Sequence, residues 1–180
     1  MRGFFLGLLI GILTVPLAAF VYLHHGHPPV AVADTKFPME KTIVQIPLHH
    51  RINQDAPSHA PIEPSATNLM LGAQIYRRQC AACHGLYGQA SSFGKNMYPE
   101  APQLWAPHGE GVVGVSDDPP GDTYWLVKNG VRLSGMPEFR NDLNETQLWQ
   151  VALLLANANK PLPSEVLDEV KPGASSPTLP

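Results

Sequence analysis

The chain has 180 residues, enough for one domain of ordinary size with further segments at its ends. Its formal net charge is −3 and no run of lysine or arginine forms a basic patch, which argues against a nucleic-acid partner and favours protein partners. Only two cysteines are present, which excludes the multiple-disulfide framework of a small secreted scaffold.

Residues 3–23 contain no charged side chain and match the ~20 apolar residues that a membrane-spanning helix needs. Arg2 precedes this run, so we expect the N-terminus in the cytoplasm and the rest of the chain on the periplasmic or extracytoplasmic side. A cleaved signal peptide, with Ala31-Val32-Ala33 at the cleavage site, is the alternative, but its apolar region would exceed the usual length of about 7–15 residues. We therefore predict a membrane anchor over residues 1–33, and either interpretation exports the remainder.

Three histidines, His24, His25 and His27, follow the apolar run directly. A cluster of imidazoles could bind a metal or a haem iron, but no second cluster at metal-ligand spacing accompanies it. We interpret these histidines as polar residues at the membrane interface and assign them no function.

Residues 34–64 carry scattered charges and five prolines, which is typical of an extended, polyproline-like linker. Fully extended, such a linker would reach about 100 Å from the membrane. The alternating residues Thr42 to Ile46 could form one short strand or lie along the domain surface.

The compact domain is predicted over residues 65–160. Ser65 or Thr67 can cap a helix that runs to about Ala82, and Gly72 in its interior predicts close approach by another helix. That partner is the helix predicted after Asn144, which has Gln147 three residues on in the pattern of a capping box.

A shorter helix is predicted over residues 121–129, ended by Gly130. The segment from 85 to 121 is rich in glycine and proline, and so long a bare loop predicts that a bound group such as a porphyrin fills part of the core. Residues 161–180 are predicted to be a tail, with one short helical turn over 164–170 and disorder from 171 onward.

The segment Cys80-Ala81-Ala82-Cys83-His84 contains both cysteines and has the attachment pattern of a c-type haem. One helical turn sets the two sulfurs at the spacing of the two porphyrin vinyl groups, and His84 follows as an iron ligand. A thioredoxin-like dithiol has the same Cys-x-x-Cys spacing but requires a preceding strand, whereas the preceding segment here is predicted to be helical.

Met136, 52 residues after His84, is the predicted second iron ligand. A thioether is a soft ligand that favours reduced iron, and Gly135 and Pro137 on either side suit a close, extended approach to a porphyrin face. The rivals are Met97, 13 residues after His84, and His108 in the long loop. We interpret Met97 as pocket lining and His108 as a loop residue.

Pro102 is the predicted acceptor for the second ring nitrogen of His84, because a ligating imidazole usually donates its other N–H to a carbonyl or carboxylate. The alternative is an ordinary loop proline with no such partner.

Together these motifs resemble the class I monohaem cytochromes c over about residues 65–160. The resemblance is carried in chain order by Gly72, Tyr76, Cys80–Gly85, Pro102, Leu104, Asn129-Gly130, Gly135-Met136-Pro137, Phe139 and Leu148-Trp149. It implies an all-α fold of cytochrome c-like orthogonal helices around one covalent haem c, with His84 and Met136 as axial ligands. Residues expected to contact the haem are Tyr76, Leu104, Trp125 and Phe139. The long loop from Trp105 to Gly121, and Leu154 where many relatives have an aromatic residue, depart from the family pattern.

The function implied is one-electron transfer by a membrane-tethered carrier between redox partner proteins, with no small-molecule substrate and no catalytic acid or base. A haem subunit of a larger membrane oxidoreductase, such as a respiratory complex, is an alternative. A haem enzyme or gas sensor would leave an iron position open, against which Met136 argues. Residues 65–160 carry seven basic and eight acidic side chains, so strong electrostatic steering of a partner is not expected.

Overall fold

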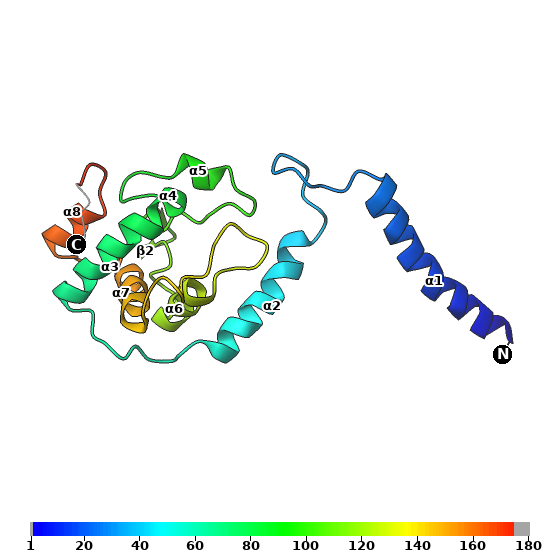
Figure 1. Ribbon diagram of the computed structural model, residues 1–180, viewed down its shortest axis with the longest axis horizontal. Coiled ribbons are helices and arrows are strands. Elements are labelled where there is room, and N and C mark those ends of the chain that lie inside the picture. Colours follow the sequence, from blue (N-terminus) through cyan, green and yellow to red (C-terminus); the bar gives the residue numbers. More distant parts are fainter. Residues whose placement is uncertain (1, 175–180) are drawn as a thin grey trace. The chain divides into compact units, whose positions relative to one another are not determined.

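The computed structural model describes residues 2–174 and divides the chain into two units, residues 1–41 and 42–180. The described part is mostly helical with two very short strands, which confirms the predicted all-α class. The first unit is built on one helix, α1 (Arg2–His25), shown in blue in Figure 1. Among the described residues, only this helix is long and apolar enough to cross a membrane, and a signal sequence would pass the same test.

Residues 40–55 form a second helix, α2 (Glu40–Asp55), so the prediction of an extended linker is wrong for this part of residues 34–64. The strand predicted from Thr42 to Ile46 is also wrong, since these residues lie inside the helix.

This segment is helical because residues at helical spacing form one less exposed face of α2, a pattern that the alternation from Thr42 to Ile46 concealed. Gln45, Leu48 and Ile52 recur at helical spacing and are less exposed than their neighbours in α2, with Ile52 buried. Burial along this face outweighs the cost of Pro47 inside the helix, because tertiary packing routinely overrides local propensity.

In the second unit, α3 (Ala66–Gln79) crosses α7 (Glu145–Ala156) at the centre of the core (Figure 1). The helix α6 (Pro120–Asn129) packs against α7, and the rings of Tyr124 and Trp149 stack between them at 4.2 Å. The remaining elements are α4 (Ala81–His84), α5 (Ser92–Lys95), β1 (Pro107–His108), β2 (Val112–Val113) and α8 (Ser164–Glu169).

Gly72 lies where α3 and α7 cross. A Cβ atom at this position would be 2.3 Å from the carbonyl oxygen of Gln150, so only glycine permits the two backbones to come this close. The predicted reason for a glycine in this helix is therefore confirmed.

The predicted helix ends are confirmed with one change. Ser65 accepts the N–H of Asn68 at 3.3 Å, and Asn144 forms a capping box with Gln147. The first helix of the domain is shorter than predicted, because α3 ends at Gln79 and the chain turns at Cys80 before the short helix α4.

The loop from 85 to 121 contains little regular structure, as predicted. It holds the single turn of α5 and a small antiparallel pair in which Pro107 faces Val113 and His108 faces Val112.

Residues beyond 160 are packed more firmly than a tail would be. The helical turn predicted over 164–170 forms as α8, and Val166 and Val170 are fully buried against α3. Arg77 of α3 forms an ion pair with Glu169 at 3.3 Å, and both side chains are 11% exposed. The disorder predicted from 171 onward falls largely on residues 175–180, outside the described residues.

Candidate functional site

The two cysteines and His84 lie on one turn of backbone that follows α3. The N–H groups of Cys83 and His84 both donate to the carbonyl of Cys80, at 3.1 and 2.9 Å, which closes this turn. Gly85 ends it with a φ of +76°, a conformation that favours glycine. Both thiols are free, Cys80 buried at the end of α3 and Cys83 half-buried in α4.

Burial, together with the nearby Cys83, raises the pKa of the Cys80 thiol to about 12. A thiol in this state is protonated at neutral pH and is a poor nucleophile for disulfide exchange, which needs a thiolate. The geometry therefore gives no support to the dithiol alternative.

The imidazole of His84 is oriented by a backbone carbonyl. Its Nδ1 lies 2.7 Å from the oxygen of Pro102, the contact expected from the sequence. With the Nδ1 proton donated to this carbonyl, the lone pair is on Nε2 and available to a metal. Burial lowers the pKa of His84, while the bond to Pro102 opposes that shift, and the neutral ring is the form that binds metals.

A polar side chain that the sequence analysis did not single out, Gln103, ties the surrounding loop to the cysteine turn. Its Oε1 accepts the N–H of Ser91 at 2.6 Å, and its Nε2 donates to the carbonyls of Ala101 at 2.9 Å and Cys83 at 3.3 Å. The only feature of the sequence that could have indicated this role of Gln103 is its position between Pro102 and Leu104. A glutamine in a loop has no distinctive pattern.

Gly94 is a second residue that the sequence analysis did not single out. A Cβ at this position would lie 1.8 Å from the carbonyl oxygen of Cys83, so α5 itself packs directly against the cysteine turn.

Tyr76 and Leu104, both expected to contact a haem, are packed behind His84. The hydroxyl of Tyr76 donates to the carbonyl of Gly85 at 2.7 Å, and the N–H of Leu104 donates to the carbonyl of His84 at 3.1 Å. Both side chains are buried in the hydrophobic core. These bonds hold the carbonyls of His84 and Gly85, the backbone that directly follows the imidazole.

The other two expected contact residues come from the opposite part of the unit. Phe139 is buried in the core and its N–H donates to the carbonyl of Val127 in α6 at 3.1 Å. Trp125, also in α6, is half-buried. Their contact with a haem stays a prediction.

Met136 lies at the end of a tight turn and is partly buried against the core. The N–H of Val131 donates to the carbonyl of Met136 at 3.2 Å, and the hydroxyl of Ser134 accepts the N–H of Met136 at 3.1 Å. Gly130, just before the turn, has a φ of +66°. A Cβ at this position would be 2.7 Å from backbone atoms of Pro137 and Glu138, so the chain before the turn lies close against the chain after it.

The two rival ligands have different surroundings. His108 is exposed, and its Nε2 contacts the carbonyl oxygen of Gly114 at 2.5 Å. Met97 is half-buried, and its methyl group lies against Gly135, beside Met136.

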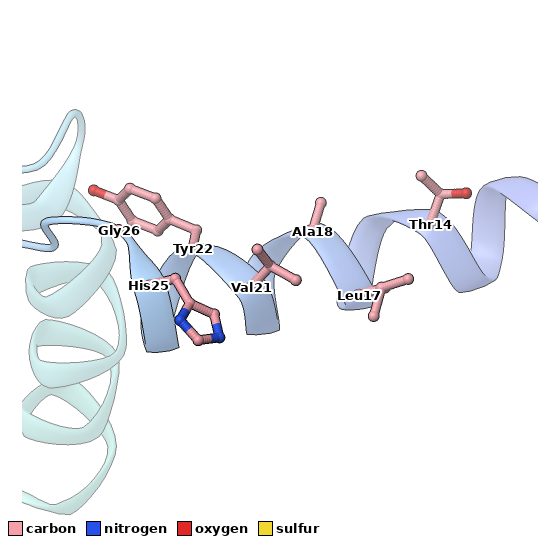
Figure 2. Close-up of a pocket in the computed structure, with 7 residues that line it drawn as sticks. All are labelled: Thr14, Leu17, Ala18, Val21, Tyr22, His25 and Gly26. Atoms are coloured by element: carbon pink, nitrogen blue, oxygen red, sulfur yellow. The ribbon is translucent and has the colours of Figure 1, made fainter.

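The histidines that follow the N-terminal apolar run belong to the first unit. His24 and His25 form the last turn of α1, and His25 helps to line a groove along that helix with Thr14, Leu17, Ala18, Val21, Tyr22 and Gly26 (Figure 2). Within the described residues, no group of three or more His, Cys, Asp or Glu side chains is arranged to hold a metal ion.

The donor set fits a haem better than a bare metal ion. It combines two free thiols on one turn, an imidazole with its Nε2 lone pair available, and a thioether in the same unit. Imidazole and thioether are axial ligands of haem iron, whereas a structural metal site would need further charged or imidazole donors.

Comparison with known proteins gives a match over residues 67–155 to the family model described as cytochrome c oxidase, cbb3-type, subunit III. A search of curated proteins found no match. Among solved structures, the chain is similar to one from the Kuenenia stuttgartiensis reducing HAO-like protein complex Kustc0457/Kustc0458, with 18% identity and a TM-score of 0.45. That alignment covers 57% of this chain and 48% of the other, so it spans about half of that protein.

Proposed function

Since residues 67–155 form a c-type cytochrome domain of the monohaem family, a domain of haem-based electron transfer, we propose that the chain is a one-electron carrier with a single covalent haem. Cys80 and Cys83 form the thioether links, and His84 and Met136 are the axial ligands. The contact of 2.7 Å between His84 Nδ1 and the Pro102 carbonyl carries the proposal, because it leaves Nε2 of that imidazole for the iron.

When bound, the haem supplies an iron that accepts and returns one electron. The residues of the chain set the conditions for this chemistry. The Pro102 carbonyl fixes the tautomer and plane of His84, and the thioether of Met136 favours the reduced state and raises the reduction potential relative to two imidazoles. With both axial positions occupied by side chains, no position is left for a substrate, which supports a carrier and not an enzyme.

The apolar helix α1 supports a membrane tether, with the haem domain on the extracytoplasmic side. The near balance of charge, seven basic against eight acidic side chains over residues 65–160, predicts electron-exchange rates with redox proteins that depend little on ionic strength. A steep fall of the rate with added salt would contradict this part of the proposal.

The axial ligands are tested with two variants of the intact protein, Met136→Ala and Met97→Ala. We expect the sulfur-to-iron charge-transfer band of the oxidised protein to disappear in Met136→Ala and to remain in Met97→Ala. Mass analysis of the exported protein reports the haem attachment and the true N-terminus together. A band that survives the loss of Met136 would refute the ligand assignment.

The match to a family described as an oxidase subunit favours a second candidate function, a haem subunit that passes electrons within a membrane oxidoreductase. Extraction with mild detergent distinguishes the two functions. A subunit purifies with stoichiometric partner proteins, whereas a free carrier purifies alone with its full haem spectrum.

A further inference from the structure

Met97 reaches across to the turn that carries Met136. A Cβ atom at Gly135 would lie 1.9 Å from the Cε of Met97 and 3.7 Å from its Sδ. The terminal methyl of Met97 therefore occupies the space that any side chain at position 135 would need.

The backbone that carries Met97 is fixed to the cysteine turn. The N–H of Met97 donates to the carbonyl of Gly94 at 3.3 Å, and the N–H of Ala101 donates to the same carbonyl at 3.1 Å. Gly94 in turn lies against the carbonyl of Cys83, where no Cβ would fit. The backbone of Met97 is therefore bonded to α5, which packs against the segment that contains the two cysteines.

The turn that carries Met136 is closed by its own hydrogen bonds between Val131, Ser134 and Met136, and it is joined to the rest of the unit at its base. Gly130 lies against the backbone of Pro137, and Phe139 is bonded to α6 and buried. At its tip, Leu133 is 89% exposed. The methyl of Met97 contacts the turn at Gly135, two residues after Leu133 and next to Met136.

We propose that Met97 is a positioning residue, which holds the turn closed against the cysteine segment and so keeps the thioether of Met136 in its place as the sixth ligand. The inference rests on the proposed function, in which Met136 binds the iron. A turn that opens exposes the sixth position to other ligands, so the rate at which an added ligand binds measures the open population. Removing the methyl of Met97 raises this population.

The test uses the intact haem-loaded protein and carbon monoxide as the added ligand. In Met97→Ala we expect carbon monoxide to associate with the reduced protein about tenfold faster, since tenfold corresponds to ~1.4 kcal/mol, below the usual cost of truncating a fully buried methionine. The charge-transfer band remains at neutral pH. Met97→Leu, which retains apolar bulk without sulfur, keeps the band and associates within about twofold of the wild-type rate.

A double variant separates this contact from a general loosening of the domain. Gly135→Ala alone places a Cβ where the Met97 methyl lies, so the end of this flexible side chain must move away, and we expect association to become faster by less than in Met97→Ala. Gly135→Ala combined with Met97→Ala puts the new Cβ into the vacated space and brings the rate back toward the wild-type value, so the two effects are not additive. Leu133→Ala, a control at the exposed tip, leaves the rate unchanged.

Each result decides the proposal separately from the ligand assignment. If Met136→Ala abolishes the band but Met97→Ala leaves the association rate unchanged, the ligand assignment stands and the positioning role is refuted. Additive effects in the double variant also refute it. If Met97→Leu abolishes the band while Met136→Ala keeps it, Met97 is itself the ligand and both proposals fall.

Discussion

Replacing Gly72 by alanine tests the crossing of α3 and α7, which sets the position of the cysteine turn. The new Cβ would lie 2.3 Å from the carbonyl oxygen of Gln150, whereas real Cβ contacts are not shorter than 3.0 Å, so the helices must separate by at least about 0.7 Å. A gap of this size forfeits about a quarter to a half of the dispersion energy of each contact along the crossing.

Two opposing energies decide the net effect. Alanine gains about 1 kcal/mol over glycine in a helix interior. Overpacking a core costs about 1–3 kcal/mol, and the value here lies at or above the upper end because the opposing atoms belong to the backbone and cannot rotate away. We therefore expect Gly72→Ala to lower the free energy of unfolding by about 2 kcal/mol.

The measurement is equilibrium unfolding of the haem-loaded protein in denaturant, followed by circular dichroism and by the haem absorbance. The control is Leu71→Ala on the same helix, where the side chain is 40% exposed and the expected loss is below about 1 kcal/mol. A Gly72→Ala protein as stable as the wild type, or more stable, would show that helix propensity outweighs the close contact and would refute this reasoning.

Three further predictions concern other parts of the second unit. Arg77→Met leaves the carboxylate of Glu169 buried without its cation, so we expect a loss of about 3 kcal/mol and faster hydrogen exchange in α8; unchanged exchange there would contradict the role of the ion pair. Gln103→Ala removes the acceptor of the Ser91 N–H and two donated bonds, and should cost about 2 kcal/mol in denaturant unfolding, with Gln103→Glu intermediate. Partial burial and two neighbouring aspartates raise the pKa of Asp118 above 3.8, so its ionised form destabilises the fold at neutral pH. Asp118→Asn should therefore raise the melting temperature at pH 7, and this gain should vanish below about pH 4, where the carboxyl is protonated in both states; a gain that does not depend on pH would reject the electrostatic cause.

Local chemistry explains which parts of the fold were predictable. The capping box at Asn144, the glycine at position 72 and the apolar run from 3 to 23 each depend on neighbours within a few residues or on composition alone, and the structure agrees with all three. The helix α2 was not predictable in the same way. Its single proline and its β-branched residues favour extended backbone, and only the burial of Ile52 makes the helical spacing decisive.

The candidate site also combines features that local sequence predicts with features that depend on tertiary packing. The sequence by itself determined the kinds of donor and their order, because the spacing of Cys80, Cys83 and His84 is set by one turn of backbone and no other cysteines compete. Only the tertiary structure decided that Gln103 binds the cysteine turn, that α8 packs on α3, and that Met97 lies against Gly135. These contacts join residues far apart in the chain through shape and unpaired backbone groups, which leave no pattern in a single sequence.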